Sequence, residues 1–318
     1  MYVIHPASCK GYIPEDLSPN HIIGELKIDG ARNVLYLGCD PYGTHDNGLY
    51  SKRESVVSGK MVDNTATARH ITGLTYKGLK NTVLDVEAFS VDLGTTTAIL
   101  NSSFRKAKAK QEEVGFLTLN VIDIVYYKGK DVRSWPLWRR KELQEEVIKK
   151  MNNTNVVAIP YWSRSLVKRF QSIAADGGEG LVIKNLNSAY GMDWAKMKKS
   201  YDISVIISGY REGKNSNYGT VGALEVSVWY KDQLVPIGHV NAGTQRQRND
   251  FNKNRKWYIG KALDVWTHEV TEPSDGFPLG KLRKPSFFRL RDDLGKKECS
   301  YKRLQYALKQ AKYIRDEY

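Results

Sequence analysis

The chain has 318 residues, 41% of them hydrophobic and 26% charged, a composition typical of a soluble globular protein with room for two domains. Its 49 lysines and arginines outnumber its 35 aspartates and glutamates, and the net charge of +14 favours a polyanionic partner such as nucleic acid. Composition alone does not separate this reading from a protein that is merely basic.

The cysteines Cys9, Cys39 and Cys299 are too far apart to form a C-x-x-C pair or a Cys/His cluster. Their spacing argues against a zinc site and a disulfide framework, and it fits a reducing compartment. The N-terminus has no apolar signal core, and no apolar run approaches the roughly 20 residues needed to cross a bilayer. We therefore expect a cytoplasmic protein that does not enter a membrane.

The first 200 residues mix strand and helix patterns. Residues 1–23 are punctuated by prolines and are too few for a separate DNA-binding domain. Alternating or short apolar runs predict strands, and wider apolar spacing predicts helices. The predicted strands are residues 24–28, 33–37, 49–53, 82–89, 117–127, 180–184 and 194–198, and the predicted helices are residues 98–113, 136–150 and 165–175. In the second helix we place Arg139, Arg140 and Lys141 away from the apolar face.

The pattern changes after Ser200 to short strands separated by turns, several of them rich in glycine. Five strands of modest spacing fit a small barrel, and an OB-fold is the economical choice. The five strands are residues 203–210, 223–230, 234–241, 263–271 and 286–290. A basic, helix-like segment at residues 250–258 interrupts them, and residues 301–318 predict a closing helix.

Five short motifs follow one another in a fixed order: residues 24–32, 84–88, 120–124, 179–184 and 194–198. The first contains a K-x-D-G pattern at Lys27, which alone would be weak. Together the motifs resemble those of the ATP-dependent DNA ligases, in the covalent nucleotidyltransferase superfamily, over roughly residues 24–294. The compact form is similar to the viral, phage and accessory bacterial members.

This resemblance implies an α+β fold with two domains. Residues 1–200 would form an adenylation (nucleotidyltransferase, ATP-grasp-like) domain with antiparallel sheets. Residues 201–295 would form an OB-fold β-barrel, and residues 296–318 a C-terminal helical extension.

The resemblance makes Lys27 the nucleophile that attacks the α-phosphorus of ATP, releases pyrophosphate and carries AMP on its side-chain nitrogen. A free lysine has a pKa of about 10.4 and is almost wholly protonated at neutral pH. Cationic neighbours disfavour the ammonium form and so activate such a lysine. Lys184, Lys196 and Lys198 match family positions around this pocket and are implied phosphate contacts.

Further nucleotide contacts are implied by the same motifs. Glu25 lies two residues before Lys27, so both side chains point to one face of a strand, and the family places this glutamate on adenine. Arg32 is an implied phosphate ligand, because a guanidinium can hold two oxygens at once. Glu87 corresponds to a ribose contact. Val86 stands where many members have glycine, but it points away from the face of Glu87.

Two positions depart from the family pattern. Ile122 stands before Asp123 where ligases usually have an aromatic residue that stacks on adenine, so part of a stacking energy of roughly 1–3 kcal/mol is missing. Leu294 follows the acidic pair of the last motif, where a lysine is common. In that motif Arg289 and Arg291 are implied to orient pyrophosphate during lysine adenylation.

Three carboxylates, Glu179, Asp29 and Glu87, are implied metal ligands. Mg²⁺ is the expected ion because it bridges phosphates and prefers carboxylate and water oxygens, and Mn²⁺ is expected to substitute. Asp29 has a second role open to it, because Asp before Gly commonly fixes a turn.

Two basic segments are implied or predicted to contact DNA. Lys52 and Arg53 match an early basic motif that touches the nick, and either can be the true equivalent. Arg246 and Arg248 lie in a basic and aromatic stretch that can follow phosphates, although a solvated connecting helix explains it equally well.

These features predict a monomeric ATP-dependent ligase that seals 5′-phosphate/3′-hydroxyl nicks in duplex DNA through a lysyl-AMP and a DNA-adenylate. An RNA ligase and a GTP-dependent mRNA capping guanylyltransferase are the first alternatives. A non-catalytic nucleic-acid-binding protein on a ligase scaffold is the second. Intact Lys27, Glu87, Glu179 and Lys184 argue against the second.

Overall fold

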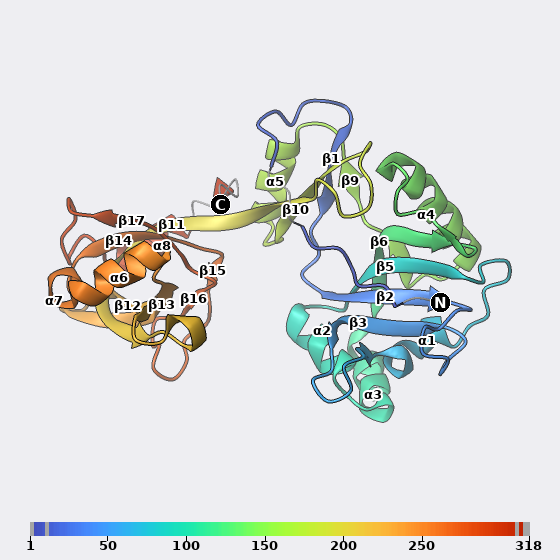
Figure 1. Cartoon of the computed structure of the whole chain (residues 1–318), viewed down its shortest axis with the longest axis horizontal. Helices are drawn as coiled ribbons and strands as arrows, with labels where there is room; N and C mark the ends of the chain where they lie inside the picture. Colours follow the sequence, from blue (N-terminus) through green and yellow to red (C-terminus); the bar gives the residue numbers. More distant parts are fainter. Residues whose placement is uncertain (1–2, 10–12, 309–311, 314–318) are drawn as a thin grey trace. The chain divides into compact units, whose positions relative to one another are not determined.

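The computed structural model describes residues 3–9, 13–308 and 312–313 (Figure 1). Two compact units divide these residues: unit 1 runs to Met197, and unit 2 begins at Lys198. Strand β11 (Ala195–Glu212) carries the chain from one unit into the other. The sequence predicted two strands at this place, and the structure has one strand of 18 residues.

The larger sheet of unit 1 has the strand order β4-β3-β2-β5-β6-β7, and all of these pairs are antiparallel. A further strand, β8, adds to β6 in parallel. The bounds are β2 (Ala31–Leu37), β3 (Gly48–Glu54), β4 (Met61–Asp63), β5 (Thr82–Phe89), β6 (Thr118–Tyr127), β7 (Lys130–Asp131) and β8 (Val156–Ala158). Leu35, Leu84, Val86, Val121 and Ile124 are fully buried in its main core, as their apolar character requires.

A second set of strands in unit 1 has the order β9-β1-β10 and continues to β11. Its members are β1 (Ile22–Leu26), β9 (Tyr161–Trp162) and β10 (Gly180–Asn185). The antiparallel register places Glu25 opposite Val182 and Ile23 opposite Lys184. This pairing brings the first motif beside the fourth, which lies more than 150 residues later in the chain.

Helices cover the sheets of unit 1: η1 (Thr65–Ala68), α1 (Arg69–Thr72), α2 (Leu93–Leu100), α3 (Phe104–Val114), α4 (Leu137–Met151) and α5 (Leu166–Ala175). The single helix predicted for residues 98–113 is therefore two helices, and Asp92 caps the first by accepting from the Thr95 amide. Helix α4 packs against β6 and β8, and α5 packs against β10.

The prediction that Arg140 and Lys141 lie away from the apolar face of α4 is wrong. Arg140 and Lys141 are buried, together with Leu137, Gln144 and Val147. Because residues at spacings of three and four share a helix face, the row from Leu137 through Lys141 and Gln144 turns inward as one. The two cations on this otherwise mixed face are buried because each has a carboxylate partner: Asp123 for Arg140 and Glu25 for Lys141.

Unit 2 is built on five antiparallel strands in the order β13-β12-β11-β14-β17, and the two edge strands β13 and β17 also lie within contact distance. The bounds are β12 (Val221–Tyr230), β13 (Gln233–Asn241), β14 (Ala262–Thr267) and β17 (Ser286–Arg291), with a separate pair, β15 (Glu269–Val270) and β16 (Leu282–Arg283). Val205, Ile207, Val226, Val228 and Leu263 form its buried core.

Short helices complete unit 2: η2 (Asn215–Asn217), α6 (Gln245–Lys253), α7 (Arg255–Tyr258) and α8 (Tyr301–Ala307). A capping box at Thr244 and Gln247 begins α6. The helix predicted for residues 301–318 ends at Ala307, and a short strand β18 (Lys312–Tyr313) pairs with β11; residues 309–311 and 314–318 lie outside the described chain.

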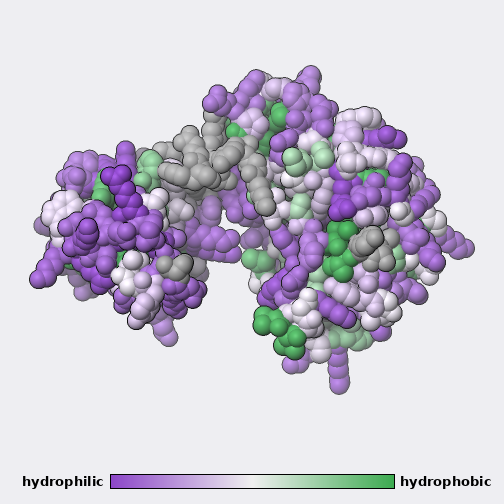
Figure 2. Space-filling model, viewed as in Figure 1, coloured by the Kyte–Doolittle hydropathy of each residue, from purple (hydrophilic) through white to green (hydrophobic). Residues whose placement is uncertain are grey.

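The face drawn in Figure 2 is mostly hydrophilic, with hydrophobic residues in small patches, as expected for a protein surface in water. Among the described residues, no helix is both long and apolar enough to span a bilayer.

Candidate active site

A small cavity of about 80 Å³ in unit 1 collects residues from each of the five ordered motifs between residues 24 and 198. The strands that supply them are β1, β2, β5, β6, β10 and β11, together with the turn after β1. Of the residues predicted from the sequence, those that line it are Glu25, Lys27, Arg32, Glu87, Ile122, Lys184 and Lys196. Cys9, Ile159, Val182 and Trp194 add walls that the sequence did not indicate.

Lys27 lies directly after β1, and its backbone N–H donates to the Gly180 carbonyl at 3.0 Å. Its Nζ donates to Glu179 Oε2 at 2.5 Å, and the two side chains are 18% and 25% exposed. A carboxylate thus contacts the candidate nucleophile, whereas the predicted cations Lys184 and Lys196 line the same cavity without a bond to it in the described contacts.

Close packing explains why glycine occupies position 30 of the K-x-D-G pattern. A Cβ at this position would overlap the Ala88 carbonyl oxygen and crowd the Glu87 side chain. Glycine therefore allows the turn after Lys27 to approach β5 closely, which brings Glu87 into the site.

Glu25 is almost fully buried between two ammonium groups. Lys141 Nζ lies 2.5 Å from Oε1, and Lys184 Nζ lies 2.5 Å from Oε2. Burial alone would raise the pKa of Glu25, but the charges of Lys141 and Lys184 outweigh it and hold that pKa below its ordinary value. Burial lowers the pKa of Lys184 against the pull of Glu25.

Lys141 was not predicted as a site residue. Its place could have been found from helical spacing, because it lies four residues after the buried Leu137 on the same face. Its Nζ also donates to the Ile122 carbonyl at 3.3 Å, so it links α4 to the strand that forms one wall of the cavity.

Arg32 is held by Asp85, another residue the sequence did not single out. Arg32 Nε and Nη2 donate to the two Asp85 oxygens at 2.5 and 2.6 Å. The Tyr190 hydroxyl donates to the same carboxylate at 2.5 Å. This two-pronged contact fixes the guanidinium plane at the cavity wall.

Asp123 and Arg140 form a fully buried ion pair behind Ile122. Arg140 Nε and Nη2 donate to the Asp123 oxygens at 2.8 and 2.9 Å. Nη1 donates to the carbonyls of Trp135 and Ser188, the latter at 3.1 Å. The pair therefore ties α4 to β6 and to the loop that leads into β11.

Glu87 is half-buried on β5, opposite Arg32 on β2. Burial raises the pKa of Glu87 to about 7, although Arg32 and Lys27 pull it down. A carboxylate with this pKa changes its charge near neutral pH, where a catalytic group is most useful.

The three predicted metal ligands differ in their position relative to the cavity. Glu87 lines the cavity and Glu179 contacts Lys27, but Asp29 is exposed in the turn and is not among the lining residues. Within the described residues, no three His, Cys, Asp or Glu side chains converge to hold a metal ion by themselves. Lys198 is also not among the lining residues.

The predicted DNA-contacting residues separate into exposed and buried ones. Lys52 and Arg53 are exposed at the end of β3, where Lys52 Nζ donates to Ser8 Oγ at 2.6 Å. Arg246 is exposed on α6. Arg248 is buried, and its guanidinium donates to the carbonyls of Val221 at 3.1 Å and Gly222 at 2.7 Å. This placement argues against a surface phosphate contact for Arg248 and makes it a structural residue of unit 2.

Arg289 and Arg291 share one buried carboxylate in unit 2. Asp264, 2% exposed, lies opposite Arg289 in the β14–β17 register and accepts from Arg289 Nε at 2.8 Å and Arg291 Nη1 at 3.0 Å. Ser204 Oγ donates to it at 2.5 Å. Arg291 also makes a two-pronged contact with Asp293, at 2.7 and 2.6 Å. Arg289 is 56% exposed and so presents the freer guanidinium.

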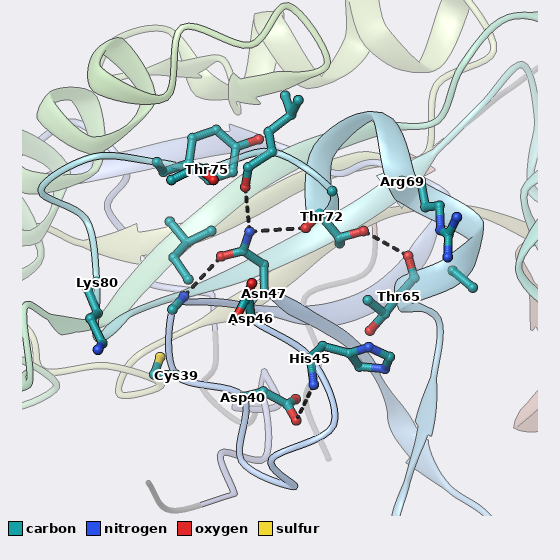
Figure 3. A pocket seen from close by; sticks show the side chains of 16 residues that line it. Cys39, Asp40, His45, Asp46, Asn47, Thr65, Arg69, Thr72, Thr75 and Lys80 are labelled. Carbon is teal, nitrogen blue, oxygen red and sulfur yellow. Dashed lines mark hydrogen bonds between the residues drawn. The ribbon is translucent and has the colours of Figure 1, made fainter.

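A wider cavity of about 820 Å³ lies elsewhere in unit 1, between the β2–β3 loop and α1 (Figure 3). Its polar groups bond largely to one another: Asn47 accepts from the Gly38 amide and donates to the carbonyls of Thr72 and Leu74. The residues predicted for the site are not among the described side chains that line it. We therefore place the chemistry in the smaller cavity.

Comparisons with known proteins agree with the motifs. The family model described as ATP dependent DNA ligase domain matches residues 7–199. DNA ligase 2 of Methanosarcina acetivorans is 26% identical over 315 residues, which cover 86% of this chain and 52% of that protein. The DNA ligase of Nitrosopumilus maritimus is 26% identical over 258 residues, covering 74% and 41%. The chain spans about half the length of the first of these relatives.

Two solved structures share the fold. One, from a structure-function analysis of Lig E DNA ligases, matches with a TM-score of 0.64 and 16% identity, covering 91% of this chain and 100% of that one. The other, named Pmar-Lig, matches with a TM-score of 0.63 and 18% identity, covering 85% and 63%. At these identities the likeness concerns the fold alone.

Proposed function

The chain belongs to the family of ATP-dependent DNA ligase domains, and from this membership we propose that it seals 5′-phosphate/3′-hydroxyl nicks in duplex DNA at the expense of ATP. The observation that carries the proposal is the single cavity shared by Lys27, Glu25, Arg32, Glu87 and Lys184. These residues come from segments far apart in the sequence. A lysine on an ordinary solvated surface would not share a cavity with charged side chains from so many strands.

In the first step Lys27 Nζ attacks the α-phosphorus of ATP. A nitrogen–phosphorus bond forms, the bond to the leaving pyrophosphate breaks, and AMP stays on the lysine. Glu179 Oε2, 2.5 Å from Nζ, is placed to take the proton that the ammonium must lose. Arg32 is oriented by Asp85 to hold phosphate oxygens as charge develops on them.

In the second step an oxygen of the DNA 5′-phosphate attacks the same phosphorus, and AMP leaves Lys27 for the DNA. In the third step the 3′-hydroxyl attacks the activated 5′-phosphate, a phosphodiester forms and AMP departs. Lys196, on the cavity wall, supplies positive charge beside the transferring phosphate.

Mg²⁺, with Mn²⁺ as a substitute, fits the donor set, because Glu87 lines the cavity and Glu179 contacts Lys27 there, and both offer hard carboxylate oxygens that would hold the ion. Asp29 is a third candidate ligand from the adjoining turn. When bound, the ion neutralises phosphate charge.

We also propose the domain roles expected from the sequence. Residues 1–200 act as the adenylation domain, residues 201–295 as an OB-fold, and residues 296–318 as a C-terminal extension whose described helix is α8 (Tyr301–Ala307). The five antiparallel strands of unit 2, with edge strands in contact, support a closed barrel of this type. The partner is nicked duplex DNA, which the net charge of +14 favours, and the protein acts as a monomer.

The test is nucleotide transfer with ATP or GTP labelled at the α-phosphate, followed by a chase with nicked duplex DNA. A labelled protein formed from ATP, and discharged as the nick is sealed, is the expected result. Lys27→Ala should form none, whereas Lys77→Ala, at an exposed lysine of unit 1, should behave as the wild type.

Label from GTP, or discharge only by RNA, would move the protein to a capping enzyme or an RNA ligase. Absence of label from both nucleotides would leave a nucleic-acid-binding scaffold without catalysis.

A further inference from the structure

The hairpin between β3 and β4 carries the two most exposed large hydrophobic side chains of the described residues. Val56 and Val57 are 102% and 98% exposed, and the next, Tyr218, is 82% exposed. Scattered single apolar residues on a surface are ordinary, but two adjacent valines without any cover are not.

The turn that presents these valines is closed by its own hydrogen bonds. The Ser55 amide donates to the Lys60 carbonyl at 2.8 Å, and the Gly59 amide donates to the Ser55 carbonyl at 2.9 Å. Ser55 Oγ accepts from the Val57 and Ser58 amides, both at 3.3 Å. Gly59 adopts a φ of +64°, which suits glycine. The valines thus project from a defined turn, and β-branched side chains lose little rotamer freedom when a partner covers them.

The charges around this tip are mainly positive. Lys52 and Arg53 are exposed on β3, and Lys60 is exposed in the turn directly before β4, where its Nζ lies 5.2 Å from the centre of the Tyr42 ring. The hairpin has two acidic residues, and each faces a histidine: Glu54 faces His5 at 3.7 Å, and Asp63, at the end of β4, faces His45 at 2.8 Å. Two apolar side chains flanked by cations are complementary to a partner that has anionic groups on its surface and apolar groups between them.

Duplex DNA has this construction. Its phosphates attract lysine and arginine, and its minor groove accepts apolar side chains that wedge against sugars and between base steps. Valine offers no hydrogen bond with which to read base edges in the major groove. Two valines are also too small an apolar area to hold a membrane or to anchor a protein interface of ordinary size.

We propose that Val56 and Val57 form an apolar wedge that enters the minor groove of the duplex beside the nick, while Lys52, Arg53 and Lys60 hold the flanking phosphates. The inference rests on the proposed function and adds the part of the substrate that this hairpin contacts. The wedge would partly unstack a base step and bend the duplex beside the nick.

The test compares Val56→Ala/Val57→Ala with Val91→Ala, a valine of unit 1 that is 59% exposed and lies outside the hairpin. Binding of nicked duplex is measured by fluorescence anisotropy at several salt concentrations. The double variant should lose about tenfold in affinity, because about half of the burial energy of two valines disappears. Its salt dependence should match the wild type, because no charge is removed.

A second readout follows 2-aminopurine placed at the base steps around the nick. Wild-type protein should brighten it by unstacking, and the double variant should not. Lysyl-AMP formation should be unchanged in both variants, because the hairpin lies outside the residues that line the nucleotide cavity.

Equal affinity and equal 2-aminopurine signal in the double variant would overturn the wedge, as would an equal loss in Val91→Ala. A failure of the proposed function is recognised separately, because it would remove lysyl-AMP from the wild type itself.

Discussion

The charged clusters of the two units differ in how they are enclosed. In unit 1, Asp123 with Arg140 and Glu25 with Lys141 and Lys184 are buried, and each carboxylate has its cationic partners inside the protein. In unit 2, one buried carboxylate, Asp264, holds two arginines whose outer ends reach solvent. Breaking a buried pair strands a charge in a medium of low dielectric, whereas an exposed guanidinium that loses its partner is rehydrated.

This difference predicts which residues combine structural and chemical roles. Substitutions in the unit 1 clusters should change the stability and the chemistry together. Substitutions around Asp264 should change the chemistry more than the stability.

The largest effect is expected for Arg140→Met, which leaves Asp123 buried without its cationic partner. The loss in free energy of unfolding should be about 3–5 kcal/mol, measured by urea denaturation. Because a buried pair replaced by apolar groups is often neutral, Asp123→Leu/Arg140→Met should recover much of that loss. A single variant as stable as the wild type would mean that this pair does not hold α4 to β6.

A smaller effect is expected for Lys141→Met, which leaves Glu25 with Lys184 alone. Loss of one charged hydrogen-bonding partner should cost about 1.5–3 kcal/mol of stability and raise the KM for ATP in lysine adenylation. Lys149→Met, at an exposed lysine of the same helix, is the matched control. An unchanged KM with reduced stability would make Lys141 a structural residue only.

In unit 2, Asp264→Asn should slow lysine adenylation about tenfold, because Arg289 and Arg291 lose the charge that orients them, while the midpoint of urea unfolding changes little. Sealing of DNA that already carries AMP should be unaffected, since those arginines are proposed to act on pyrophosphate. Arg289→Lys should impair adenylation more than Arg291→Lys, because the contacts of Arg291 with Asp264 and Asp293 leave it less exposed. If Asp264→Asn slowed lysine adenylation and the sealing of adenylated DNA equally, a role of the two arginines in adenylation alone would be refuted.

The smallest effect concerns pH. The folded-state pKa of Glu87 is about 7 against an ordinary 4.5, so between these values the unfolded chain is ionised while the folded protein still holds the proton. Stability should therefore fall as pH rises through this window, by on the order of 1 kcal/mol after allowance for solvent at a half-buried group. Melting temperatures of wild type and Glu87→Gln between pH 4.5 and 7.5 would measure it. The variant should show the weaker slope, and identical slopes would refute the assignment.

Much of the architecture followed from local patterns. The strands at Thr82–Phe89 and Thr118–Tyr127 and the helices at Leu137–Met151 and Leu166–Ala175 lie close to the predicted bounds, because their apolar period is long and clear. The break between α2 and α3 was missed, because an amphipathic pattern can continue in sequence across a short turn. Short strands such as β4 and β7 were missed as well, since they exist through pairing rather than propensity.

For the candidate site, the sequence by itself determined the motifs, their order and the residue types that the chemistry needs, because a family resemblance is read residue by residue. Only the tertiary structure decided which partners those residues have. Lys141 beside Glu25, Asp85 beneath Arg32 and Asp264 between two arginines are contacts between segments distant in the chain. For Arg248 the tertiary structure differs from the prediction: the sequence predicts an exposed cation, but its guanidinium is buried and donates to backbone carbonyls inside unit 2. Burial and pairing are properties of the folded core, and no local pattern of charge contains them.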